Sequence, residues 1–176
     1  MSQGSRTFGF CPCCGSPEFE KKGERNWRCK RCGFDFYQNV ASAVAAIIID
    51  KDKGLLTTRR GIEPQKGTLD LPGGFVEYGE TAEEALQREA KEELGVKINV
   101  VRYLWSQANI YTYSGIDVHT LDQFFLCEID GDDSLTPMDD ISETKWISIE
   151  DLDENQFGLT SIRETIIRLK NCIFAI

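Results

Sequence analysis

The sequence predicts an α/β fold in which helices pack on a mixed sheet, preceded by a small module that a metal stabilises. Three features predict it: cysteines crowd near the N-terminus, β-branched segments follow them, and the middle of the chain carries one strongly patterned helix. Strands that are adjacent in sequence and interspersed with helices are typical of a mixed sheet with helices on its faces. We expect the small module in residues 1–38 and the larger domain in residues 39–176.

The first element is a pair of cysteine knuckles. Cys11 and Cys14 form one CxxC pair, Cys29 and Cys32 form the second, and a glycine follows each pair. Two such pairs at this spacing predict a four-cysteine zinc site, and hence a zinc ribbon. So short a segment cannot bury enough apolar surface to fold alone, so zinc would supply folding energy. A redox-active CxxC pair is the alternative.

Charge is unevenly distributed between the two parts. The net charge of the chain is −9, yet residues 1–40 carry seven Lys/Arg against four Asp/Glu. The acidic remainder is a poor candidate for binding phosphate backbones by bulk charge, so phosphate chemistry there would need divalent cations. Nucleic acid is therefore not the expected partner, although the basic residues of the ribbon leave that alternative open. These are Lys21, Lys22, Arg25, Arg28, Lys30 and Arg31.

No apolar run approaches the roughly 18 residues that a membrane helix requires. The first ten residues also lack the apolar core of a secretory signal. We therefore expect a cytoplasmic protein without a membrane partner.

Strands are expected where β-branched and aromatic residues gather. The run ASAVAAIIID at 41–50 predicts a buried strand, and Leu55–Arg59 predicts a second one after a turn. A loop rich in Gly and Pro then leads to the central helix. Further strands are expected at 96–105, 120–129 and 144–149.

Two helices are expected, each from its capping signals. Thr81 and Glu84 have the spacing of a capping box, and Gly95 has the position of a C-cap, so the central helix should span about 81–94. A last helix should begin near Ser161, with Glu164 completing a second capping box.

The central helix places two acidic residues on its apolar face. On a helical wheel, Glu89 and Glu93 lie in the stripe formed by Ala85, Leu86 and Ala90. Buried carboxylates on one face repel each other, and each costs several kcal/mol unless it is paired. A hard divalent cation would satisfy them. The alternative is that this edge of the stripe is exposed and the glutamates are ordinary surface residues.

The residues around this helix match a known pattern. Gly74 is followed after five residues by Glu80, and seven residues later by Arg88–Val96, which reads REAKEELGV. This resembles the Nudix box, Gly-x5-Glu-x7-Arg-Glu-U-x-Glu-Glu-x-Gly-U, where U is a bulky apolar residue. The resemblance covers most of residues 40–170.

The resemblance implies a fold and a metal site. The fold would be an α/β/α sandwich with a mixed sheet. Glu89, Glu92 and Glu93 would bind Mg²⁺ or Mn²⁺, and Gly73 would add its backbone carbonyl. Arg88 would orient the glutamates. Glu80 and Gly74 would support the site.

The implied reaction is hydrolysis of a nucleoside diphosphate linked to some group X, by attack of water on the P–O–P bridge. Glu92 or Glu93 would accept the proton. Some relatives also use a residue from a downstream loop, and Glu143 lies at such a position, although it could equally be a solvated loop residue.

A four-cysteine ribbon ahead of this domain is similar to the NADH pyrophosphatases, whose SQPWPFPxS motif marks their specificity. This chain keeps Ser106, Gln107 and Ser114 but carries ANIYT and Tyr113 between them. NADH, NAD⁺ and ADP-ribose are the expected kinds of substrate. Tyr111 and Tyr113 could stack on a base or ribose, or pack in the core.

Arg60 ends the second strand and could hold a substrate phosphate, or it could be solvated. A homodimer is implied by the resemblance alone. The alternative to an enzyme is a catalytically silent Nudix regulator, which holds a nucleotide while its ribbon contacts nucleic acid or protein.

Overall fold

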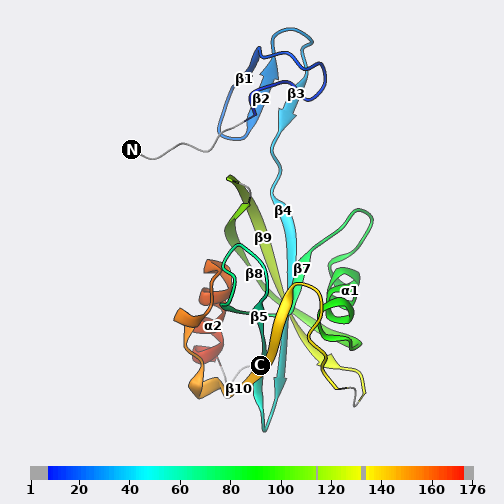
Figure 1. The fold of residues 1–176 in the computed structure, drawn as a ribbon, viewed down its shortest axis with the longest axis vertical. Coiled ribbons are helices and arrows are strands. Elements are labelled where there is room, and N and C mark those ends of the chain that lie inside the picture. Colours follow the sequence, from blue (N-terminus) through cyan, green and yellow to red (C-terminus); the bar gives the residue numbers. More distant parts are fainter. Residues whose placement is uncertain (1–7, 114, 132–133, 173–176) are drawn as a thin grey trace.

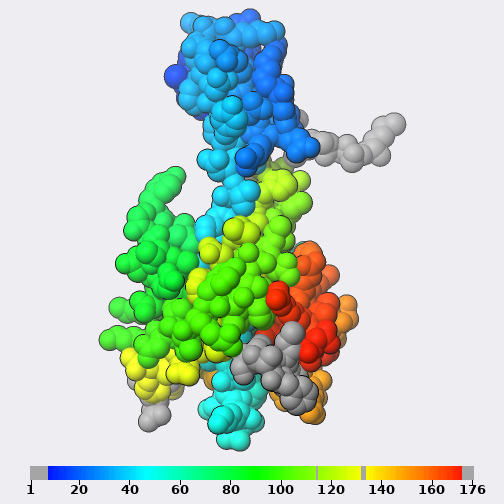
Figure 2. All heavy atoms as spheres, turned by 180° about the vertical axis from the view of Figure 1, so that it is seen from behind, coloured from blue at the N-terminus to red at the C-terminus, as the bar shows by residue number. Residues whose placement is uncertain are grey.

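The computed structural model describes residues 8–172, except 114, 132 and 133. In this part the strands form two separate sheets, and Figures 1 and 2 show the small sheet standing clear of the larger domain on a narrow connection. No helix in the described ranges is both long enough and apolar enough to cross a membrane.

The small sheet contains β1 (Phe19–Lys21), β2 (Asn26–Cys29) and β3 (Asp35–Tyr37), in antiparallel order. Its core is a cluster of four buried residues: Cys11, Phe19, Trp27 and Cys29. Trp27 also packs against the rings of Phe8 and Phe36. The cluster is small, and two of its four members are cysteines.

The large sheet is mixed. Its main path runs β10-β5-β4-β9-β8, while β6 pairs with β5 and β7 pairs with β4. The β4–β9 pair is parallel and the remaining pairs are antiparallel. The strands are β4 (Ala41–Asp50), β5 (Gly54–Arg60), β6 (Leu69–Asp70), β7 (Gly73–Phe75), β8 (Ile98–Tyr113), β9 (Ile116–Ile129) and β10 (Ile141–Ile147).

One helix covers each face of this sheet. The helix α1 (Ala82–Leu94) packs through Ala85, Leu86, Ala90 and Leu94 against one apolar cluster. The helix α2 (Thr160–Cys172) packs through Ile162, Ile166 and Leu169 against a second cluster on the other side. Two short 3₁₀ helices, Ile149–Asp151 and Glu154–Gln156, precede α2. The expected α/β sandwich with a mixed sheet is confirmed, and Figure 1 shows its layers.

The sheet splits open at one end. The strands β4 and β5 pair only near their turn, at Ile49↔Leu55 and Asp50↔Gly54. Beyond that point they diverge, and β7 continues along β4 while β6 continues along β5. The split leaves room for a cavity between the two halves of the sheet.

The predicted capping of α1 is confirmed. Thr81 accepts a hydrogen bond from the backbone N–H of Glu84, the Glu84 side chain accepts one from the N–H of Thr81, and Gly95 ends the helix with φ at +73°. The second capping box is wrong. Ser161 lies inside α2 rather than at its cap, and its hydroxyl donates to the buried carboxylate of Asp122.

The strands after α1 are longer than expected. The strand β8 continues through the SQANIYTY segment to Tyr113, and β9 begins at Ile116, so the two form one long hairpin. Cross-strand pairs run from Ile98↔Ile129 to Tyr113↔Ile116, with register shifts between Val100 and Arg102 and between Tyr103 and Trp105. The segment aligned with the specificity motif is therefore a strand whose side chains alternate between its two faces.

Candidate active site

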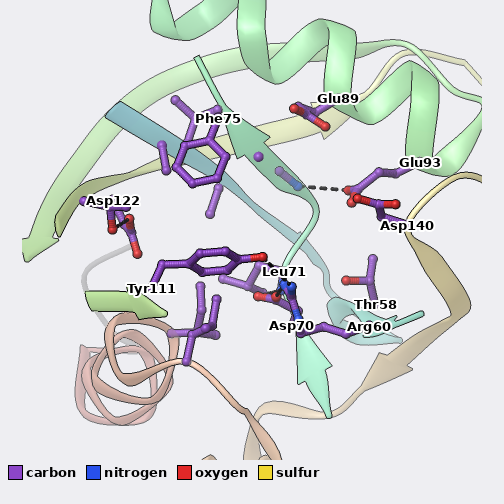
Figure 3. A pocket seen from close by; sticks show the side chains of 18 of the residues that line it. Thr58, Arg60, Asp70, Leu71, Phe75, Glu89, Glu93, Tyr111, Asp122 and Asp140 are labelled. Carbon is purple, nitrogen blue, oxygen red and sulfur yellow. Dashed lines mark hydrogen bonds and ion pairs between the residues drawn. The ribbon is translucent and has the colours of Figure 1, made fainter. Parts of the chain in front are cut away.

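A cavity of about 570 Å³ opens where β4 and β5 diverge. Side chains of α1, β7, β8 and β9 line it. Figure 3 shows Glu89 and Glu93 at one end and Asp122 on the opposite wall, with Phe75 and Tyr111 between them. The cavity thus joins an acidic end to an aromatic and polar end.

Arg88 fixes the directions of three carboxylates. Its Nε donates to Glu80 Oε1 at 2.7 Å, and its Nη1 donates to Glu89 Oε1 and Glu92 Oε2, each at 2.9 Å. Its Nη2 donates to the carbonyl of Phe75 at 2.9 Å, which ties the helix to β7. The hydrogen bond from Arg88 lowers the pKa of Glu80. Arg88 therefore lies at the centre of an ion-pair network that orders the acidic end of the cavity.

Glu93 is the most buried of these acids. Its side chain accepts a hydrogen bond of 3.0 Å from the N–H of Gly73, and only 7% of the residue is exposed. Burial raises the pKa of Glu93 to about 9, and the charges of Glu89, Asp70 and Asp140 add to this effect. Burial likewise raises the pKa of Glu89. The fold thus holds these acids close together at an energetic cost.

Two glycines allow this close approach. A Cβ on Gly74 would lie 2.2 Å from Glu89 Oε1, and a Cβ on Gly73 would lie 2.1 Å from the carbonyl oxygen of Val44. Gly73 also has φ at +147°, a conformation that other residues rarely adopt. A side chain at Gly73 would push β7 away from β4, and a side chain at Gly74 would displace the carboxylate of Glu89.

The acidic residues fit a divalent cation by the chemistry of their donors. Mg²⁺ and Mn²⁺ favour carboxylate oxygens, and Glu89, Glu92 and Glu93 present them from one helix to one cavity. Within the described ranges, their oxygens do not converge as closely as the four cysteine sulfurs do. The reason is that Arg88 binds Glu89 and Glu92, whereas Gly73 binds Glu93.

Glu143 does not join this cluster. It lies on β10 opposite Arg59 and accepts a hydrogen bond of 2.8 Å from Arg59 Nε, and it does not line the cavity. Asp139 and Asp140 line the cavity instead, and Figure 3 shows Asp140 beside Glu93. A role for Glu143 as a metal ligand stays a prediction, and Asp139 and Asp140 are the acidic residues of this part of the chain that line the cavity.

Arg60 lines the cavity, as expected, but it is already paired. Its guanidinium donates to Asp70 at 2.7 Å, to the carbonyl of Pro64 at 2.8 Å and to the Tyr111 hydroxyl at 3.2 Å. Burial raises the pKa of Asp70 despite this pairing. Tyr113 lines the cavity as well, so neither tyrosine packs in the apolar core.

Two polar features of the cavity have no obvious signal in the sequence. Thr58 is 1% exposed. Its hydroxyl is buried and, among the described residues, is the one buried side-chain polar group that lacks a hydrogen-bond partner. Asp122 is 6% exposed and accepts hydrogen bonds from Asn109, Thr120 and Ser161. Two of these partners lie on the β8–β9 hairpin and the third lies on α2, so only the fold brings them together.

The four predicted zinc ligands do converge. The Sγ atoms of Cys11 and Cys32 are 3.7 Å apart, as are those of Cys14 and Cys29, and all four lie within 4.8 Å of one another. A tetrahedron with Zn–S bonds of about 2.3 Å has edges of roughly 3.8 Å. The N–H of Cys32 donates to the Cys29 sulfur and helps to lower its pKa to about 7. This donor set fits zinc.

Several curated proteins with similar sequences are described as NAD-capped RNA hydrolases. The chain is 33% identical over 164 residues to the NAD-capped RNA hydrolase NudC of Deinococcus radiodurans. The aligned region covers 92% of this chain and 56% of that protein. The chain is 31% identical over 147 residues to NudC of Salmonella typhi, covering 84% and 54%. The chain thus spans about half the length of the curated relatives it matches.

Solved structures support the fold. A NUDIX hydrolase from Nitrosomonas europaea superposes with a TM-score of 0.72 at 23% identity, covering 93% of this chain and 90% of that one. An ADP-ribose pyrophosphatase from Streptococcus suis gives 0.56 at 21% identity, covering 78% and 92%. The family model for the NUDIX domain matches residues 40–169, which include the whole acidic helix and the cavity that it lines. On this match and this geometry, the chain belongs to the Nudix family.

Proposed function

We propose that this protein is a Mg²⁺- or Mn²⁺-dependent pyrophosphohydrolase. It cleaves the P–O–P bridge of a nucleoside diphosphate linked to a group X, and NADH, NAD⁺ and ADP-ribose are the expected kinds of substrate. The observation that carries the proposal is the acidic end of the cavity. Arg88 orders Glu80, Glu89 and Glu92 there, and the backbone of Gly73 holds Glu93 beside them.

In this reaction the residues would have separate roles in metal binding, positioning and proton transfer. Glu89, Glu92 and Glu93 would hold the divalent cation, which when bound neutralises phosphate oxygens and makes water a better nucleophile. Arg88 and Glu80 would position these carboxylates. In the reaction a P–O bond forms from water and a P–O bond of the bridge breaks. Glu92 or Glu93 would accept the proton that water loses.

The rest of the cavity would hold the two groups that flank the bridge. Arg60 retains N–H groups beyond those it gives to Asp70, Pro64 and Tyr111, and these could bind a phosphate oxygen. Tyr111 and Tyr113 present aromatic rings to the cavity. The names of the NudC relatives support a substrate that contains NAD. The altered SQ motif does not support specificity for NADH over related compounds.

The zinc ribbon has a structural role in this proposal. Zinc bound by the four cysteines would stabilise a module whose core contains few other residues. Homodimerisation and a cytoplasmic location stay predictions, and size-exclusion chromatography with light scattering tests the first of them.

Product analysis tests the activity. The protein is incubated with Mg²⁺ or Mn²⁺ and with NADH, NAD⁺, ADP-ribose, FAD or nucleoside triphosphates, and the products are separated by chromatography. Conversion of at least one dinucleotide or ADP-ribose to AMP is the expected result. Glu93→Gln should lower kcat by about 10³-fold, because it removes a charge that would hold the cation. Glu83→Gln, an exposed site on the same helix, is the matched control and should keep full activity.

A catalytically silent sensor is the second candidate. Tight binding of a nucleotide without turnover of any compound, with either metal, would favour it over the enzyme. The complete Nudix box in residues 74–96 supports the enzyme.

A further inference from the structure

Asp122 is a buried carboxylate that has no role in the proposed metal binding or proton transfer. It accepts hydrogen bonds from Asn109 Nδ2 at 3.1 Å, Thr120 Oγ1 at 2.6 Å and Ser161 Oγ at 2.5 Å. Within the described ranges it forms no ion pair with Lys, Arg or His. A carboxylate has about four acceptor positions, so three donors leave one for a further partner.

The sheet register places Asp122 across from an aromatic ring, with a gap between them. Ala43 on β4 pairs with Asp122 on one side and with Phe75 on the other, so the three residues form one row on the same face of the sheet. Two strand spacings separate Phe75 from Asp122, or about 10 Å between their Cα atoms. Ala43 contributes only a methyl group to the middle of the row. All three residues line the cavity.

Aromatic surface borders this gap. Tyr111 lies edge-on to Phe75, with ring centroids 5.8 Å apart, and Phe75 is 41% exposed. In Figure 3 both rings lie between the acidic end of the cavity and Asp122. A flat apolar wall beside a hydrogen-bond acceptor fits a planar ring that carries a donor at its edge.

We propose that Asp122 is a specificity-determining residue that accepts a hydrogen bond from an NH₂ group on a planar ring of the substrate. The ring lies over Ala43 against Phe75 and Tyr111, while the phosphates extend toward Glu89 and Glu93. This inference rests on the proposed function and deepens it by naming the group that the far end of the cavity selects. Two rings of a nicotinamide dinucleotide carry such a group: the adenine amino group and the nicotinamide carboxamide.

Two analogues of NAD⁺ separate these sources. Nicotinic acid adenine dinucleotide replaces the carboxamide by a carboxylate, and nicotinamide hypoxanthine dinucleotide replaces the adenine amino group by an oxygen. The wild-type protein should disfavour one of them by about 10- to 100-fold in kcat/KM relative to NAD⁺, because an acceptor then faces Asp122 where a donor is required. The analogue that suffers identifies the ring. Equal kcat/KM values for all three compounds would overturn the inference.

Asp122→Asn tests the residue itself. It should reduce the discrimination against the affected analogue by at least about 10-fold, chiefly through KM, since the amide can donate as well as accept. The ratio of two substrates does not depend on how much of the variant is folded. Asp117→Asn, the same change at an exposed site on the same hairpin, is the control and should leave the ratio unchanged. A purely structural role for Asp122 predicts a lower melting temperature with an unchanged ratio, and that result would overturn the inference.

Binding measurements keep this inference distinct from the proposed function. Calorimetry with Ca²⁺ in place of Mg²⁺ compares the affinities of NAD⁺ and the two analogues without requiring turnover. A protein that hydrolyses nothing but still prefers NAD⁺ over one analogue contradicts the enzyme proposal and supports the role of Asp122. Binding of all three compounds with equal affinity, or of none of them, contradicts the role of Asp122.

Discussion

The predicted metal ligands of the ribbon and those of the Nudix domain have opposite consequences for folding. In the ribbon, two of the four core residues are themselves cysteines of the predicted zinc site, and from residue 8 onward the ribbon has no larger apolar cluster. The Nudix domain has two extensive apolar clusters, one under each helix. Its acidic residues add nothing to these clusters, since Glu93 is buried among other carboxylates and its pKa rises to about 9. The predicted metal ligands therefore support folding in the ribbon and oppose it in the Nudix domain.

This difference indicates that zinc would act on the stability of the ribbon, whereas the divalent cation would act in the function of the Nudix domain. A module with so small a core depends on the energy of metal binding. A domain with a sufficient core can hold charged groups in an unfavourable arrangement and reserve them for function. Three measurements would break or sharpen this contrast.

The largest effect is expected from losing zinc. Cys14→Ser should release the metal and unfold the ribbon, because structural zinc supplies on the order of 10 kcal/mol in small modules. Zinc content by atomic absorption and the rate of tryptic cleavage within residues 21–31 measure the change. Cys13→Ser is the neighbouring control, since Cys13 is exposed and outside the four-sulfur cluster, and it should keep both zinc and resistance to cleavage. A ribbon that resists trypsin equally in both variants would contradict this account of its stability.

A smaller effect is expected from pH in protein that retains zinc but lacks Mg²⁺. The pKa of Glu93 is raised in the folded state, so the folded protein binds more protons than the unfolded chain between about pH 5 and 9. Its contribution to stability is present below this window and is lost as the pH rises through it. Between pH 6 and 8 the free energy of unfolding should fall by roughly 2–3 kcal/mol from this group, as measured by urea titration.

Glu93→Gln should remove that part of the pH dependence and raise the stability at pH 8, although it lowers kcat. Glu83→Gln should keep the wild-type slope. Added Mg²⁺ should also flatten the slope in the wild-type protein, because a bound cation stabilises the charged carboxylate. An identical slope in wild type and Glu93→Gln would show that Glu93 does not oppose folding.

The smallest effect is expected at the start of α1. Thr81→Ala removes the side chain that accepts from the N–H of Glu84, and helix caps of this kind contribute about 1 kcal/mol. The melting temperature of the Nudix domain should fall by a few degrees with kcat unchanged. Thr112→Ala, an exposed threonine on the β8–β9 hairpin, serves as a surface control. A large loss of activity in Thr81→Ala would mean that α1 is held less firmly by its core than the apolar cluster indicates.

The sequence by itself determined the local features. The limits of α1 follow from Thr81, Glu84 and Gly95, because capping depends on residues a few positions apart. The convergence of the four cysteine sulfurs follows from the spacing of two short turns. The inward direction of Glu89 and Glu93 follows from the helical period, and the Nudix box lies within one continuous segment for the same reason.

Only the tertiary structure decided which distant residues share the cavity. Arg60 meets Tyr111 across 51 positions, and Ser161 meets Asp122 across 39, contacts that no local pattern encodes. The position of Asp140 in the cavity wall, and of Glu143 outside it, depends on where β10 joins β5. The row of Phe75, Ala43 and Asp122 exists only because three strands pair in one register. The register and the packing depend on the whole core. The end of the cavity that contains Phe75, Ala43 and Asp122 therefore forms only when the sheet is complete.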